Sequence, residues 1–249
     1  MRAVAALFAG GLLLAAVPAP AAAPSVDQEI DALTVRVEKL EGSRAVKKLQ
    51  RAFGFYVDRG LWDEAADLFA DNGTIEIGMD GVYVGKARIK DYLKRLHGNQ
   101  DGLIYGQLNE WVTLQPVVDV APDGLSAKGR WRDLGMLGQY KKHAEWRDGT
   151  YENDYVKEDG VWKIQRLNYM MQWQADYEAG WAKTTAHLQP AMACYPENPI
   201  GPDRILSEDN YRPTWPHRQE IKMSFAHPVL GQKFVVEEFT KLMTKGPAQ

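Results

Sequence analysis

The chain has 249 residues, 45% of them hydrophobic, which is enough for one domain with extensions or for two small domains. Its formal net charge is −3, and it lacks the excess of basic residues that nucleic-acid binding requires, so we expect no nucleic-acid partner. Cys194 is the single cysteine, which excludes an intrachain disulfide and a thiolate metal cluster.

The amino terminus has the pattern of an export signal. Residues 1–23 carry one basic residue, Arg2, followed by an apolar run. Ala19 and Ala21 place small residues where a signal peptidase cleaves, so we predict a Sec signal peptide over residues 1–21. The apolar run is short for a membrane span, although an uncleaved anchor is the alternative. We therefore expect a periplasmic or secreted protein with no membrane span after cleavage.

An amphipathic helix is predicted next, over residues 22–43. Ile30, Leu33, Val37 and Leu40 recur at heptad spacing among charged residues. Two heptads are too few for a stable coiled coil by themselves. We expect this helix to dock on its own domain or on a neighbouring subunit of a homo-oligomer, a dimer or a trimer. Gly42 with Ser43 predicts a break before the following helix.

Three helices and a short hairpin are predicted between residues 44 and 96. Leu49, Phe53 and Tyr56 form one apolar stripe on the first helix, at 44–59, and Gly60 ends it. A second helix is predicted at 61–68, followed by a turn at 71–73. Alternating polar and apolar residues predict strands at 74–77 and 82–84, joined through Asp80-Gly81, and a third helix follows at 86–96.

Four long antiparallel strands follow, which makes the chain α+β. Their predicted ranges are 103–121, 125–137, 144–158 and 161–173. Pro116 implies that the first of them is an edge strand or carries a bulge. Gly129 and Gly135 suit strong curvature in the second.

The rest of the chain, residues 174–249, is rich in proline but interrupted by aromatic residues. Disordered tails are poor in aromatic residues, so we expect an ordered, extended arm. A short helix is predicted at 235–243. The arm is expected to wrap its own domain or a neighbouring subunit, where it would lid the pocket.

Several segments together resemble the SnoaL-like branch of the nuclear transport factor 2-like superfamily. They are YVDRGLWD at 56–63, LFADNGT at 68–74, VG at 84–85, the hairpin at 152–164 and the strand pair at 114–118 and 127–132. The resemblance covers residues 44–173. It implies a cone-shaped α+β fold, in which three helices pack on a curved, mainly antiparallel sheet around a deep, largely apolar pocket. This fold hosts many chemistries, so the likeness is specific for fold rather than for reaction.

Motifs for cofactors and metals are missing from the sequence. No glycine-rich dinucleotide or phosphate loop and no nucleophile elbow occurs. None of the five histidines pairs with another at a metal-ligand spacing. We therefore predict neither a cofactor nor a metal.

The resemblance points to Asp58 and Tyr56 as catalytic residues, because an acid and a tyrosine near this helix end project into the cone of related dehydratases. A carboxylate beneath aromatic side chains would have a raised pKa, which suits a general base. A tyrosine hydroxyl would polarise a substrate oxygen. The alternative is that Asp58 caps the helix or pairs locally with Arg59.

Strand residues complete the predicted site. The resemblance adds Tyr151 to the catalytic group, and Arg132 is the candidate to bind an oxyanion. Related sequences often carry histidine where Trp111 stands, so His97 or His143 would have to replace it in space. The sequence does not fix which strand face is concave. The predicted substrate-binding residues are Trp111, Asn109, Asn153, Tyr169, Phe55 and Tyr105.

The favoured function is a cofactor-independent lyase that acts on a small aromatic or hydrophobic molecule by acid–base catalysis. It would be a dehydratase or a C–C lyase of the deformylating diarylpropane type, both of which the resemblance includes. One alternative is a non-catalytic small-molecule binding protein with an apolar pocket. Another is an assembly protein with a filled cone. The side chains that line the pocket discriminate among the three.

Overall fold

The computed structural model describes residues 24–185, 192–205, 215–216, 221 and 223–232. Three helices and six strands account for most of residues 26–176. In chain order they are α1 (Val26–Asp58), α2 (Trp62–Asp67), β1 (Phe69–Ile77), β2 (Val82–Val84), α3 (Lys86–Leu96), β3 (Gln107–Val120), β4 (Ser126–Gln139), β5 (His143–Glu158) and β6 (Val161–Asp176).

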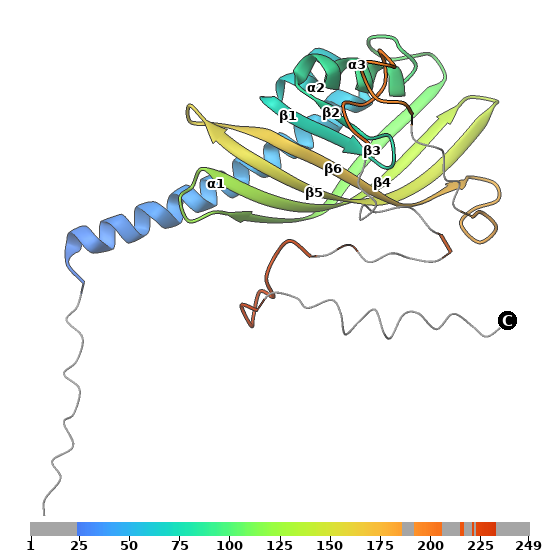
Figure 1. The fold of residues 1–249 in the computed structure, drawn as a ribbon. Coiled ribbons are helices and arrows are strands. Elements are labelled where there is room, and N and C mark those ends of the chain that lie inside the picture. Colours follow the sequence, from blue (N-terminus) through green and yellow to red (C-terminus); the bar gives the residue numbers. More distant parts are fainter. Residues whose placement is uncertain (1–23, 186–191, 206–214, 217–220, 222, 233–249) are drawn as a thin grey trace, which may run out of the picture.

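The six strands form one curved sheet in the order β2-β1-β6-β5-β4-β3. β1 runs parallel to β6, and every other neighbouring pair is antiparallel. The helices α1, α2 and α3 lie on the concave side of this sheet (Figure 1). The predicted cone-shaped α+β fold is therefore confirmed.

The core lies between the concave face and the helices. Phe53 and Val57 of α1 are buried there, opposite the aromatic side chains Trp131, Tyr151 and Tyr169 of three adjacent strands. Strand alternation sends every second residue of β4, β5 and β6 to this face. The sheet therefore supplies an aromatic floor, and α1 supplies an aliphatic and aromatic cover.

Two predicted breaks are wrong. α1 continues through Gly42 without a break. A Cβ at this position would lie 3.1 Å from Cζ2 of Trp162, so glycine lets the helix approach β6 closely. The cost of glycine in a helix, about 1 kcal/mol, is small enough for such packing to offset. Residues 71–73 lie within β1, where the pairing with β6 shifts between Phe69 and Thr74. The turn-forming residues there accommodate an irregularity of the strand.

The edge position predicted from Pro116 is confirmed. β3 is the last strand of the sheet, and its pairing with β4 shifts between Leu114 and Val117. Gln115 has a φ of 50°, so the backbone is left-handed just before the proline. Proline is tolerated at such a place because its missing N–H is not needed by a neighbouring strand.

Parts of the carboxy-terminal arm contact the same chain. The backbone N–H of Val82 donates to the carbonyl of Arg204 at 2.9 Å, so residues near 204 extend the sheet beyond β2. Ile221 is buried, and its carbonyl accepts from Arg130 Nη2 at 3.5 Å. The predicted signal peptide at 1–21 and the predicted helix at 235–243 lie outside the described residues. Within the described ranges, no helix is both long enough and apolar enough to cross a membrane.

Candidate active site

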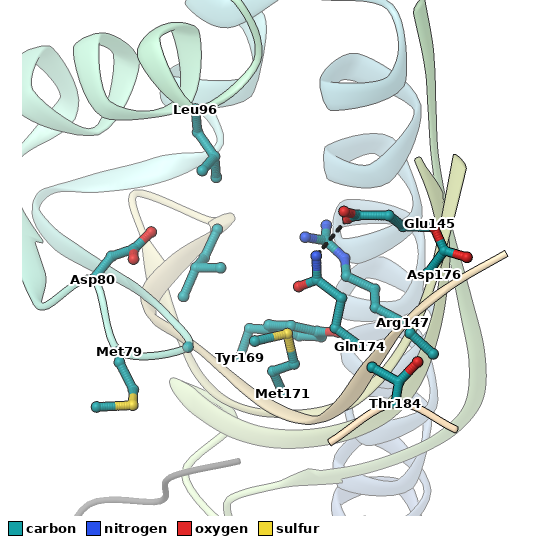
Figure 2. A pocket seen from close by; sticks show the side chains of 13 residues that line it. Met79, Asp80, Leu96, Glu145, Arg147, Tyr169, Met171, Gln174, Asp176 and Thr184 are labelled. Atoms are coloured by element: carbon teal, nitrogen blue, oxygen red, sulfur yellow. Dashed lines mark hydrogen bonds between the residues drawn. The ribbon is translucent and has the colours of Figure 1, made fainter. Parts of the chain in front are cut away.

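A cavity of about 550 Å³ opens on the concave side of the sheet. Figure 2 shows Arg147 and Asp80 on opposite sides of it, with Tyr169 and Met171 below them. We call this cavity the chamber. It is lined by Ile77, Gly78, Met79, Asp80, Leu96, Glu145, Arg147, Tyr169, Met171, Gln174, Ala175, Asp176 and Thr184.

The register of the sheet gathers the polar groups of the chamber floor. Trp111 of β3 pairs with Gly135 of β4, which pairs with Arg147 of β5. In the next row of the concave face, Asp133 pairs with Gly149. Residues of one face that occupy adjacent rows are near neighbours. The sheet therefore brings a tryptophan, an arginine and an aspartate from three strands together.

Two glycines make room for the large side chains. A Cβ on Gly135 would lie 2.6 Å from Cγ of Arg147, and one on Gly149 would lie 2.4 Å from Cζ of Tyr169. Real Cβ atoms do not approach other atoms so closely. The side chains of Arg147 and Tyr169 therefore lie flat across the glycines of the adjoining strands.

Arg147 is a buried cation with free donors. Its guanidinium carbon lies 3.4 Å from the ring centroid of Trp111, and only 8% of the residue is exposed. Nε and Nη2 are buried and have no hydrogen-bond partner among the residues that the structure describes. A desolvated guanidinium with unused N–H groups is suited to bind an oxyanion or another developing negative charge.

Asp133 is completely buried, and neither of its carboxyl oxygens has a hydrogen-bond partner in the described part of the chain. Burial raises its pKa from the ordinary value of 3.8 to about 7, although the charge of Arg147 and the hydroxyl of Tyr169 lower it. A carboxyl group with such a pKa changes its protonation state near neutral pH. Asp133 is therefore suited to accept a proton in a general acid–base step.

Tyr169 stands between Asp133 and the cavity. It lines the chamber, and its hydroxyl is near enough to Asp133 to affect the pKa of that carboxyl, but not in hydrogen-bond geometry with it or with another described residue. Burial raises the pKa of Tyr169 well above its ordinary value. The phenol therefore keeps its proton unless Asp133 accepts it, which makes the pair a two-step proton path.

His97 adds a neutral imidazole to the same cluster. Its Nδ1 lies 2.8 Å from the carbonyl of Leu93, which assigns the ring proton to Nδ1 and leaves Nε2 as an acceptor. Nε2 is buried without a partner in the described segments, and burial lowers the pKa of His97 to about 4. Its ring lies 5.7 Å from that of Trp111, so of the two histidines considered as replacements, His97 is the one beside this tryptophan.

The structure brings three of the predicted site residues to the chamber or directly beneath it. Tyr169 lines the chamber, and the guanidinium of Arg147 lies over the ring of Trp111. The ring centroid of Tyr151 lies 4.9 Å from that of Tyr169. Asn109 supports this group, because the indole Nε1 of Trp111 donates to its Oδ1 at 2.7 Å. Asn153 lies apart from them, in a buried network with Gln50.

Asp58 lies at the seam between α1 and β3, outside the lining of the chamber. Its Oδ1 accepts the backbone N–H of Trp111 at 2.9 Å, and it lines a separate groove of about 260 Å³ together with Phe55. Burial raises its pKa to about 6, which the hydrogen bond from Trp111 opposes. Asp58 therefore holds the edge strand that carries Trp111.

The remaining predicted residues are not in the chamber lining. Phe55 is 66% exposed on the outer side of α1, and Tyr105 is 93% exposed before β3. Tyr56 is half-buried and packs against the core. Arg132 directly precedes Asp133 in β4, so its side chain lies on the opposite, convex face of the sheet. There it pairs with Asp148 at 3.4 Å.

The sequence prediction missed Arg147 and Asp80, which line the chamber, and Asp133, which lies behind Tyr169. Arg147 and Asp133 share a strand face with Trp111, Tyr151 and Tyr169, but this becomes visible only once the strands are aligned. The sequence feature that could have identified them is the pair Gly135 and Gly149, which leave room for the large side chains of Arg147 and Tyr169 on the adjoining strands. Asp80 was assigned to a turn, yet its carboxylate accepts from the hydroxyl of Tyr92 at 2.7 Å at the chamber wall.

The chain is similar to several solved structures. The chain is similar to a candidate scytalone dehydratase from Novosphingobium aromaticivorans DSM 12444, with 20% identity over 61% of this chain and 92% of that one, and a TM-score of 0.48. It is similar to LinA with 17% identity over 63% of this chain and 99% of that one, and a TM-score of 0.50. A hexachlorocyclohexane dehydrochlorinase, LinA-type3 from Novosphingobium barchaimii LL02, gives 18% identity over 65% and 99%, and a TM-score of 0.49.

At 17% identity, the likeness to LinA bears on the fold alone. A comparison with curated protein sequences found no match. The family model described as the SnoaL-like domain matches residues 38–168, just over half of the chain. The chain therefore belongs to the SnoaL-like domain family.

Proposed function

We propose that the protein is a cofactor-independent lyase, which eliminates a leaving group from a small aromatic or hydrophobic molecule bound in the chamber. One observation carries the proposal. A fully buried carboxyl group with a pKa near 7, Asp133, lies behind Tyr169 on a chamber floor that also carries the unpaired donors of Arg147. Buried groups with shifted pKa values beside a cavity are typical of acid–base catalysis.

The proton moves through Tyr169 to Asp133. As the substrate gives up a proton to the phenol oxygen of Tyr169, the phenol proton passes to the ionised carboxylate of Asp133. The electron pair left on the substrate forms the new double bond, and the leaving group departs with its own bonding pair. Asp133, now protonated, returns its proton to the leaving group or to solvent, which restores the starting state.

Arg147 stabilises the charge that develops during this step. Its Nε and Nη2 have no other described partner, so they are available to the leaving atom or to a substrate oxygen. Donors fixed in a buried site stabilise such a charge more strongly than water does, because they need no reorganisation. The ring of His97 packs beside Trp111, outside the chamber lining, and burial lowers its pKa to about 4, so it adds no second positive charge next to Arg147 near neutral pH.

Part of the chamber wall is polar, formed by Asp80, Glu145, Arg147, Gln174, Asp176 and Thr184, and part is apolar, which suits the hydrophobic body of a substrate. Ile77, Leu96 and Met171 line the apolar part together with the ring of Tyr169. Dehydration and deformylating C–C cleavage both start with the removal of one proton, so both fit the Asp133–Tyr169 pair. Elimination is also the class of reaction in the names of the dehydratase and the dehydrochlorinase with a similar fold. The proposal itself depends on the chamber residues.

The test is a turnover screen with aromatic compounds that carry a leaving group beside an acidic C–H, and with lignin-type aromatic dimers that carry a hydroxymethyl group. Products are followed by mass spectrometry, with Asp133→Asn as the matched control. We expect the wild type to eliminate water or formaldehyde from at least one compound and the variant to lose this activity. Tight binding of these compounds without turnover by the wild type would instead indicate the non-catalytic binding protein.

A further inference from the structure

The first half of α1 projects from the domain and does not pack against the rest of the described chain. Residues 24–38 are exposed, whereas the second half of the same helix buries Val46, Phe53 and Val57 against the sheet. Figure 1 shows this helix leaving the body of the molecule as a straight rod. The expectation that it docks on its own domain is therefore wrong for this segment.

Five large apolar side chains line one side of the projecting rod. Their positions alternate in steps of four and three, the spacing of heptad positions d and a. All are at least half exposed, from 50% to 71%. We call this stripe the seam; it consists of Val26, Ile30, Leu33, Val37 and Leu40.

The seam faces away from the domain to which α1 belongs. Each residue advances the helix by about 100°, so the centre of the seam lies about 160° around the axis from the face of Val46, Phe53 and Val57. The seam is thus not an extension of the core stripe. A different surface must cover it if it is to be buried at all.

We propose that the seam is the interface of a parallel, two-stranded coiled coil between two copies of this chain. A free peptide of this length would be only marginally helical. Here the packed half of α1 already nucleates the helix, and a capping box between Ser25 and Gln28 closes its amino-terminal end. The rod is therefore preorganised, so association need not order it first.

The side chains of the seam select two strands. Its a positions hold β-branched Ile30 and Val37, and its d positions hold Leu33 and Leu40 after Val26. β-branched residues at a with leucine at d favour a parallel dimer over higher assemblies.

The flanking charges select a parallel arrangement. In a parallel pair, Arg36 at position g faces Glu41 at position e of the other copy, and two-fold symmetry repeats this attraction. The antiparallel alignment that sets Leu33 opposite Val37 would place Arg36 against Arg36 and Asp27 against Glu41. Residues 24–43 hold five acidic and two basic side chains, so an anionic lipid surface would repel the rod. A second copy is the partner that fits.

Disulfide trapping tests this arrangement in the full-length protein, and the result does not depend on the proposed lyase activity. Cys194 is first replaced by serine, and Leu33→Cys is compared with Val35→Cys under a mild oxidant. Leu33 lies on the seam and Val35 on the opposite side of the same rod, with exposed fractions of 54% and 46%. We expect a covalent dimer from Leu33→Cys only, because parallel d positions lie within disulfide reach. Equal trapping at both positions, or none at position 33, would overturn the proposal.

Sedimentation equilibrium is the second test of the proposed dimer. Val37→Glu should weaken dimerisation at least tenfold, whereas Val35→Glu on the side of the rod opposite the seam should leave it unchanged. Both variants should keep the circular dichroism of the wild type, since neither side chain belongs to the core. A trimer mass for the wild type, or the same association constant for both variants, would contradict a two-stranded seam.

Discussion

Two buried polar clusters lie on the concave face of one sheet, and they differ in how well their hydrogen bonds are satisfied. In the first, which we call the Gln50 network, Oε1 of Gln50 accepts from Asn153 at 2.9 Å and from Tyr155 at 2.8 Å, and Tyr155 in turn accepts from Trp131 at 3.0 Å. Among the described residues, only Nε2 of Gln50 lacks a partner within this network.

The second, the chamber cluster, contains His97, Asp133, Arg147 and Tyr169. Each of these four side chains has at least one buried polar atom without a partner in the described part of the chain. Unsatisfied buried groups cost stability, so a satisfied network is expected where polar residues serve the fold. We therefore assign the Gln50 network to the stability of the fold, and the unsatisfied groups of the chamber cluster are what the proposed lyase function would use.

Replacement of Asp133 by asparagine should have the largest effect on activity. Removing the proton acceptor should lower kcat/KM by about 10³-fold, in the range of general-base catalysis. The variant should not lose stability at pH 8, because ionising the buried carboxyl costs the wild type energy that asparagine avoids. Steady-state kinetics and chemical denaturation measure the two effects. A variant that is both unfolded and inactive would place Asp133 with the structural cluster.

Arg147→Met should have the next largest effect and lower kcat/KM by about 10²-fold, as is typical when a donor to a developing charge is removed. The methionine keeps much of the apolar contact with Trp111. Arg132→Met is the matched control, since Arg132 lies half-exposed on the opposite face of the sheet. Its kinetics should stay within about twofold of the wild type, as for surface substitutions generally. Equal losses from both variants would remove the special role of Arg147.

Gln50→Leu should give the reverse pattern. It leaves the hydroxyl of Tyr155 buried without an acceptor and removes one of the two acceptors of Asn153 Nδ2, so the free energy of unfolding should fall by about 1–3 kcal/mol. Activity per folded molecule should remain, because none of these groups lines the chamber. Urea denaturation and kinetics at low temperature separate the two. An inactive but stable variant would break the comparison.

The pH dependence should separate rate from stability. Because Asp133 must be ionised to accept a proton, kcat/KM should rise about tenfold per pH unit and level off above about pH 7. The pKa of Asp133 is raised in the folded state, so its contribution to stability is full below about pH 4 and is lost as pH rises through about 7. A rate profile with its midpoint near pH 4 would argue against Asp133.

Asp58→Asn should have the smallest effect, less than about tenfold on kcat/KM, since the asparagine oxygen can still accept the N–H of Trp111. A kinetic assay at pH 8 tests this. A loss as large as that of Asp133→Asn would make Asp58 the base, as the family resemblance suggested.

Local signals in the sequence were sufficient for much of the fold. β2 and α3 match their predicted ranges because turn-forming residues directly precede each of them, Asp80-Gly81 before β2 and Gly85 before α3. The two failed breaks depend on contacts that are distant in sequence. Gly42 faces Trp162, and residues 71–73 bridge the irregularity between Phe69 and Thr74, which both pair with β6. Neither contact is visible from the local pattern.

The site was harder to predict than the fold. The family resemblance pointed to Tyr151 and to the position of Trp111, and Tyr169 was predicted from its face of the last strand. Asp133 and Arg147 look like ordinary surface charges until the register places them on the concave face. The choice of that face depends on where α1 crosses the sheet, which no local pattern specifies.

The most direct test of the chamber cluster is an NMR titration of the Asp133 carboxyl, with ¹³C-labelled aspartate and the Asp133→Asn variant to assign its resonance. We expect one aspartate signal that titrates with a midpoint near pH 7 and is absent from the variant. If the signal lost from the variant titrates near pH 4, Asp133 is an ordinary carboxylate and the proposed proton path is wrong.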